Sequence, residues 1–167
     1  ILKENLGYYI KLYDIWSSYR PETEGVFLAY ASIHGNTAKA ALALQEMLER
    51  RGVQVECADV CRSDVAECVE NAFRYSRMVL CASSYDGGVF LPMEDFLHHL
   101  KAKTYRSRKV ALVENGTWAP SAAKAMGEIL GSMKDITLCD KTVTICSAVK
   151  EETLRELEEL ADAVAAM

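Results

Sequence analysis

Apolar and polar positions follow two alternating periods along the chain. From residue 25 onward, short apolar runs rich in β-branched or aromatic residues are separated by longer stretches with an amphipathic, helical period. Each run has the length of a strand, and each is followed by a helical stretch. The pattern predicts strands near residues 25–31, 53–58, 77–83, 108–114 and 142–147, and helices near residues 36–51, 63–75, 92–103, 120–132 and 150–166.

Five strand–helix pairs predict an α/β fold. A parallel neighbour cannot be reached by a tight hairpin, so this alternation indicates parallel strands joined by right-handed helical crossovers. The expected architecture is a three-layer sandwich with a five-stranded parallel sheet and helices on both faces. A further apolar run at residues 136–139 either begins the last strand or stands as a separate piece, and the pattern leaves both readings open.

The first 24 residues differ from the rest. Residues 2–18 have a helical apolar period, and a polar stretch containing Pro21 follows them. We expect residues 1–24 to form a helix and a connector ahead of one domain at residues 25–167. The chain does not begin with Met, which suggests a fragment of a longer protein in which this segment is an interdomain linker.

Composition narrows the class of protein. A chain of 167 residues, 50% apolar and 26% charged with three prolines, suits one packed globular domain. The net charge of −5, from 24 acidic and 19 basic residues, argues against a nucleic-acid partner. The apolar runs are far shorter than the roughly 20 residues that cross a bilayer, so no membrane partner is expected.

The six cysteines show neither a CxxC motif nor the paired Cys/His spacing of zinc sites. Without a secretory signal, buried and reduced thiols are the better interpretation than disulfides, and this favours a cytoplasmic protein. No metal site is expected.

The loop after the first strand has the chemistry of a phosphate cradle. In an open parallel sheet, ligands bind beyond the carboxyl ends of the strands, where the strand order reverses. Small polar residues around a glycine leave backbone N–H groups free, and the following helix aims its dipole at one anion. The loop has no Lys or Arg and matches neither GxxxxGK[ST] nor GxGxxG, which favours a phosphate monoester. An ordinary helix N-cap by Ser32 or Asn36 is the alternative. The loop consists of Ser32, Ile33, His34, Gly35, Asn36 and Thr37.

Two later loops could hold a flat ring. Adjacent glycines after the third strand permit close approach of a planar ligand, and Tyr85 and Phe90 offer ring faces. Trp118, after the fourth strand, could stack on the other side. The alternatives are a glycine-rich turn whose aromatic residues close the core, and an indole packed between helices. The candidate ring contacts are Ser83, Ser84, Tyr85, Asp86, Gly87, Gly88, Asn115, Gly116, Thr117 and Trp118.

Together these residues resemble a flavodoxin-like domain, and most closely the carboxy-terminal flavodoxin module of the flavodiiron proteins, or A-type flavoproteins. Ser32, Gly35, Asn36 and Thr37 are similar to the family's Ser-x-x-Gly-Asn-Thr phosphate loop. Residues 13–17, Tyr-Asp-Ile-Trp-Ser, resemble the family's interdomain segment. The second and third loops depart from the family patterns Pro-Thr and Tyr-Gly-Trp-Gly-Gly. Strand order 2-1-3-4-5 with FMN at the switch point is a known property of flavodoxins, and here it is implied by the resemblance.

The resemblance also implies a function. The chain would bind FMN as its cofactor and relay electrons from a reductase or rubredoxin to a diiron domain elsewhere in a longer chain, and a homodimer is compatible with this. The chain itself has three histidines and no HxExDH run, so it lacks the diiron ligands, and we expect it to contain no catalytic residues. Two alternatives remain: a stand-alone NAD(P)H:quinone-type FMN oxidoreductase and a cofactor-free interaction domain with the flavodoxin shape.

Overall fold

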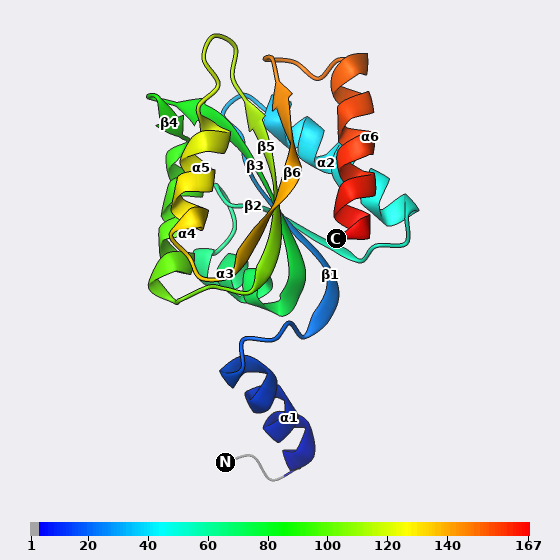
Figure 1. The fold of residues 1–167 in the computed structure, drawn as a ribbon, viewed down its shortest axis with the longest axis vertical. Coiled ribbons are helices and arrows are strands. Elements are labelled where there is room, and N and C mark those ends of the chain that lie inside the picture. The colour runs from blue at the N-terminus through cyan, green and yellow to red at the C-terminus, as the bar shows by residue number, and fades with distance from the viewer. Residues whose placement is uncertain (1–3) are drawn as a thin grey trace.

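The computed structural model describes residues 4–167 and contains a parallel sheet between two layers of helices (Figure 1). The helices are α1 (Leu6–Ser17), α2 (Asn36–Arg50), α3 (Val65–Arg74), α4 (Leu91–Ala102), α5 (Ala122–Gly131) and α6 (Glu151–Ala166). The strands are β1 (Thr23–Ala31), β2 (Val55–Asp59), β3 (Tyr75–Tyr85), β4 (Gly88–Val89), β5 (Arg108–Asn115) and β6 (Ile136–Ile145).

The five long strands are parallel and run in the order β2-β1-β3-β5-β6. This confirms the expected sheet order, because β5 and β6 are the fourth and fifth parallel strands. The structure adds a sixth strand that the apolar pattern missed: the two-residue β4 pairs antiparallel with the end of β3. Such a short strand contains no period to detect.

The apolar run at residues 136–139 belongs to the last strand. Leu138 lies opposite Val110 and Thr142 lies opposite Leu112, so β6 contains extra residues where its register with β5 shifts. This bulge separates the two apolar runs of one edge strand, which explains why they look like two pieces in the sequence.

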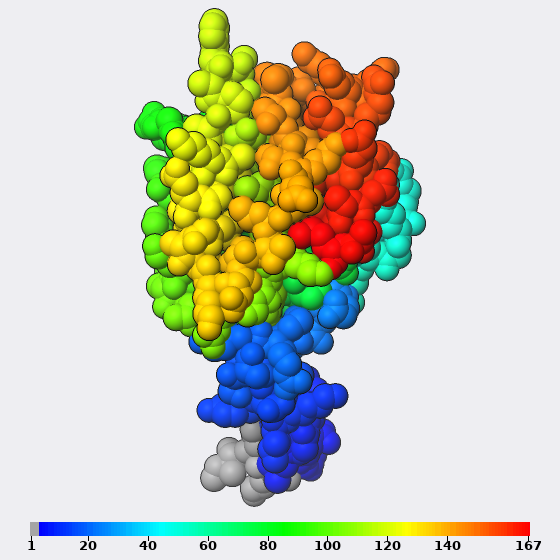
Figure 2. Space-filling model, viewed as in Figure 1, coloured from blue at the N-terminus to red at the C-terminus, as the bar shows by residue number. Residues whose placement is uncertain are grey.

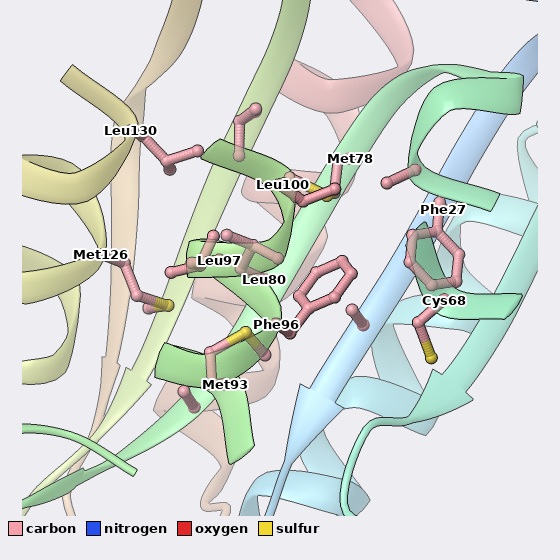
Figure 3. Packing of buried hydrophobic residues seen from close by; sticks show 14 of the residues in the cluster. Phe27, Cys68, Met78, Leu80, Met93, Phe96, Leu97, Leu100, Met126 and Leu130 are labelled. Atoms are coloured by element: carbon pink, nitrogen blue, oxygen red, sulfur yellow. The ribbon is translucent and has the colours of Figure 1, made fainter. Parts of the chain in front are cut away.

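Both faces of the sheet are buried, which explains the nearly continuous apolar runs of the strands. In β1, Phe27 and Ala29 point to the layer formed by α3, α4 and α5, whereas Val26 and Leu28 point to α2 and α6. Figure 3 shows Phe96 of α4 lying over Phe27 and Leu80, and the rings of Phe27 and Phe96 meet edge to face at 6.2 Å.

Helix α1 stands away from the body of the molecule (Figure 2). None of its residues is buried, although its large apolar side chains would normally be. The exposed side chains are Leu6, Tyr8, Tyr9, Ile10, Tyr13 and Trp16.

The connector after α1 is fixed to the amino ends of the strands. The buried guanidinium of Arg108 donates to the carbonyl oxygens of Tyr19 at 2.7 Å, Phe73 at 2.6 Å and Tyr75 at 3.0 Å. Burial lowers its pKa. Since Phe73 lies in the last turn of α3, the negative end of that helix dipole helps to hold the charge. Among residues 4–167, Arg108 forms no salt bridge, and it joins three segments through their carbonyl oxygens.

We expect Arg108→Ala to lower the free energy of unfolding by about 3 kcal/mol or more, because carbonyl groups of three segments would lose their donor. Urea unfolding followed by circular dichroism measures this. Lys109→Ala is the matched control, since Lys109 is exposed and its loss should cost less than about 0.5 kcal/mol. Equal stability of the two variants would contradict the role given to Arg108.

Candidate functional site

The carboxyl ends of β1, β3, β5 and β6 surround a polar hollow of about 240 Å³. Parallel strands bring their carboxyl ends to one edge of the sheet, and the chain reverses its strand order between β1 and β3. The hollow is lined by Ser32, Ile33, His34, Asn36, Thr37, Ser83, Ser84, Asn115, Gly116, Thr117 and Ser147. All except Ser147 were predicted from the sequence.

The loop between β1 and α2 presents free backbone donors to this hollow. Gly35, with a φ of +84°, forms the N-cap of α2, and the Gly35 amide donates to Ser32 Oγ at 3.0 Å. The first amides of a helix have no acceptor inside it. Within residues 4–167, the amides of Asn36 and Thr37 donate to no other backbone carbonyl and to no side chain. No Lys or Arg lines the hollow. These free amides fit a phosphate group held by the main chain.

Thr37 connects the phosphate loop to β3. Its side chain is fully buried, and its Oγ1 lies 2.9 Å from Ser83 Oγ. This hydrogen bond between a buried and a half-buried hydroxyl links the loop after β1 to the end of β3.

The second loop is a rigid hairpin and not an irregular glycine-rich loop. Strand β3 continues to Tyr85, and Asp86 and Gly87 form a two-residue turn with φ values of +46° and +73°. Positive φ at both central residues is typical of the type I′ turns that join hairpin strands. Tyr85 is 43% exposed, with its ring 5.9 Å from that of Phe90. One side of Tyr85 is therefore open at the rim of the hollow.

The third loop projects from the molecule between β5 and α5 (Figure 1). Trp118 is 98% exposed, which excludes an indole packed between helices in this structure. At the base of the loop, a Cβ on Gly116 would lie 2.9 Å from both Pro120 Cα and Ser84 Oγ. The close approach of these segments therefore requires glycine at this position.

The first amides of α5 already donate hydrogen bonds to side chains, in contrast to those of α2. Ser84 Oγ accepts from the amides of Ser121 at 2.9 Å and Ala122 at 3.2 Å. The buried carboxylate of Glu114 accepts from the Ala123 amide at 2.8 Å and from Thr144 Oγ1 at 3.0 Å. The first amides of α5 thus have acceptors, and a negative charge lies beside them. Of the two helices α2 and α5, only α2 has first amides without an acceptor among the described residues, so only α2 can offer them to an anion.

The other predicted site residues lie around the rim. Gly35 shapes the phosphate loop, and the Gly88 carbonyl oxygen accepts from Ser121 Oγ at 2.8 Å. Residues of the hairpin and of the projecting loop lie outside the lining of the hollow; these are Tyr85, Asp86, Gly87, Gly88 and Trp118.

Ser147 was missed because no motif marks it. The apolar pattern places it at the end of the predicted strand 142–147, between Cys146 and Ala148, and only the strand order brings it to the same hollow as the phosphate loop. The Asn115 side chain reaches to the backbone of Ser147, with Nδ2 donating to Ser147 O at 3.0 Å and Oδ1 accepting from Ser147 N at 3.2 Å.

A larger hollow of about 400 Å³ lies at the opposite end of the sheet, where basic and acidic side chains are mixed. Its arginines already donate to carbonyl groups: Arg77 to Val164 and Ala165 of α6, and Arg108 to the connector. These bonds give both arginines a structural role, so this hollow is the weaker candidate for a ligand site.

Three further features of the described residues concern metal ions, membrane-spanning helices and cysteines. Residues 4–167 contain no cluster of three or more His, Cys, Asp or Glu that could hold a metal ion, and no helix among them is long and apolar enough to cross a membrane. All six cysteines are free: Cys68 and Cys81 are buried, Cys57 and Cys139 are half-buried, and Cys61 and Cys146 are exposed. Burial raises the pKa of the Cys57 thiol to about 11.

Comparison with known proteins shows the fold. No family model matches the chain. An uncharacterized protein of Methanocaldococcus jannaschii is 21% identical over 159 residues, which are 95% of this chain and 40% of that protein. The rubredoxin oxygen:oxidoreductase of Desulfovibrio gigas superimposes with a TM-score of 0.88 at 15% identity, over 96% of this chain and 39% of that one.

The flavodiiron protein of Giardia intestinalis also gives a TM-score of 0.88, at 17% identity, over 98% of this chain and 41% of that protein. An archaeal flavodoxin gives 0.74 at 21% identity, over 86% of this chain and 97% of that protein. The chain has the flavodoxin-like fold, and it spans about 40% of the length of the longer proteins that it resembles.

Proposed function

We propose that this chain is an FMN-binding electron-transfer domain. One observation carries the proposal: the amides at the start of α2 have no acceptor within the described residues, and they face a hollow whose described lining includes no Lys or Arg. Such a site suits a phosphate monoester. The likeness of the fold to flavodoxins supports the same ligand.

The hollow is too small to hold the whole of FMN. A volume of about 240 Å³ is below the 300 Å³ or so of typical pockets for ligands of this size, so the hollow would take the phosphate and the ribityl chain. The flavin ring would then lie at the rim, with Tyr85 and Trp118 flanking it. A ring held in this way stays accessible to a redox partner, and the bound flavin supplies the electron chemistry.

The closed N-terminus of α5 favours FMN over a dinucleotide. A second phosphate would need another group of free donors, whereas Ser84 and Glu114 already accept from the amides of α5. The Glu114 carboxylate would also repel a second phosphate.

We expect Thr37→Val to weaken FMN binding at least about tenfold, because valine keeps the shape of threonine but removes the buried hydroxyl between the phosphate loop and Ser83. Isothermal titration calorimetry with FMN measures this. Thr142→Val, on the exposed side of β6, is the control and should bind as the unchanged protein does. Absence of FMN binding by the unchanged protein would overturn the proposed function and favour a cofactor-free domain.

Glu114 is expected to lower the reduction potential of the bound flavin. Glu114 is 8% exposed and lies near the end of β5, just before the third loop, so its carboxylate would oppose a negative charge added to the flavin. We expect Glu114→Gln to raise the potential by tens of millivolts, on the order given by Coulomb interaction at protein dielectric.

A spectroelectrochemical titration of the FMN-loaded protein tests this. Asp86→Asn is the comparison, because Asp86 lies exposed at the tip of the hairpin and water should screen its charge. A shift for Asp86→Asn that equals or exceeds the shift for Glu114→Gln would contradict the prediction.

We further propose that the domain accepts electrons from a reductase or rubredoxin and passes them to a diiron domain of a longer chain. The similarity to the Desulfovibrio gigas and Giardia intestinalis proteins supports this. This chain covers only about 40% of the length of each of them, which leaves room for a further domain in a longer chain. The exposed apolar face of α1 also supports it, since that face would be covered by a neighbouring domain. The free cysteines suit a reducing compartment such as the cytoplasm.

If residues 1–24 are an interdomain linker, removal of residues 1–18 should leave the domain intact. We expect FMN affinity to change less than about twofold and the free energy of unfolding by less than about 1 kcal/mol, because α1 buries none of its residues. Calorimetry and urea unfolding measure the two quantities. Loss of folding would instead show that α1 belongs to the domain.

A further inference from the structure

The loop after β6 holds Ser147 in a strained conformation. Its φ is +70°, and the Ala148 amide donates to the Cys146 carbonyl oxygen at 3.0 Å. A hydrogen bond across one residue with positive φ defines the rare form of the γ-turn. Non-glycine residues adopt this region at a cost, and such residues gather at functional sites.

Asn115 holds this turn in place. Its side-chain amide pairs with both backbone groups of Ser147, at 3.0 and 3.2 Å, much as a neighbouring strand would. The next amide, of Gly116, donates to Ile145 O at 3.0 Å, so the end of β6 is tied to β5 directly before the turn as well as within it. Both polar atoms of the Asn115 amide are thus bonded to Ser147, which gives this side chain a positioning role at the turn.

The hydroxyl of Ser147 is left free by these contacts. Within residues 4–167 it has no hydrogen-bond partner, and it lines the same hollow as Ser32 and Asn36 of the phosphate loop. The structure thus fixes the backbone of Ser147 and leaves its hydroxyl available to a ligand.

The place of Ser147 indicates which part of a ligand it would meet. The phosphate donors follow β1, and Ser147 follows β6, three strand positions away in the order β1-β3-β5-β6. Ser147 lines the hollow, which the proposed function assigns to the phosphate and the ribityl chain, and the flavin ring is expected outside it, at Tyr85 and Trp118. The part of the ligand left for Ser147 is therefore the hydroxyl-bearing chain between phosphate and ring.

We propose that Ser147 is a ligand-binding residue whose hydroxyl bonds the ribityl chain, and that Asn115 is the residue that positions it. This inference rests on the proposed binding of FMN. The strained turn is then retained because it aims the hydroxyl, and not because the fold needs it.

The test uses Ser147→Gly, which removes the hydroxyl and leaves a residue that adopts positive φ without strain. We expect the affinities for FMN and for riboflavin, measured by calorimetry, to fall by the same factor of about five to ten, as for one lost hydrogen bond. The thermal unfolding temperature should stay the same or rise. Asn115→Ala should weaken both ligands to a similar degree.

Ser107→Gly is the matched control. Ser107 also has a positive φ, of +55°, but it lies at the opposite end of β5, where its amide donates to Lys134 O. The Ser107→Gly variant should bind FMN and riboflavin with the affinities of the unchanged protein.

The outcomes separate this inference from the proposed function. Full affinity of Ser147→Gly overturns the role of Ser147 while the binding of FMN stands. A loss for FMN but not for riboflavin overturns the assignment to the ribityl chain, because only the phosphate differs. If the unchanged protein binds neither ligand, the proposed function fails and this inference fails with it.

Discussion

The parallel direction of the five long strands decides where every functional group of this molecule lies. Backbone pairing in one direction forces all carboxyl ends to one edge of the sheet, so loops separated by more than 100 residues meet there. Helices must then return each strand to the start, and their apolar faces bury the sheet on both sides. The same arrangement aims the N-terminus of α2 at the hollow. The site is a consequence of the topology before any particular side chain is considered.

Within that arrangement, the two helix ends at the site differ in how their amides are satisfied. The amides that begin α5 are bonded to Ser84 and to the buried carboxylate of Glu114, whereas those that begin α2 face the hollow. Unpaired donors are costly when water is excluded, so a ligand that supplies acceptors gains most at α2. This asymmetry gives the site one place for an anion. It is the physical basis for proposing a ligand with a single phosphate.

At the opposite end of the sheet, side chains fix the connector that follows α1. Arg108 binds carbonyl groups of the connector, of α3 and of β3, and Arg106 lies over the ring of Tyr19 at 3.7 Å. These contacts set the direction in which α1 leaves the domain. An exposed apolar helix that is held firmly at its base can present a defined face to a neighbouring domain, so under the proposed function the two ends of the sheet would serve binding and attachment separately.

Much of the fold could be predicted from the sequence, since apolar periods reflect burial directly. The five parallel strands, their helices and the residues of the phosphate loop are local features, and Gly35, Asn36 and Thr37 carry their chemistry in their order along the chain. Hydrogen bonds between distant segments leave no local trace. The closure of α5 by Ser84 and the hold of Asn115 on Ser147 depend on which strands are neighbours, so only the tertiary structure decided them. Side-chain type determined which residues could serve the site, and three-dimensional proximity determined which of them have free polar groups left to do so.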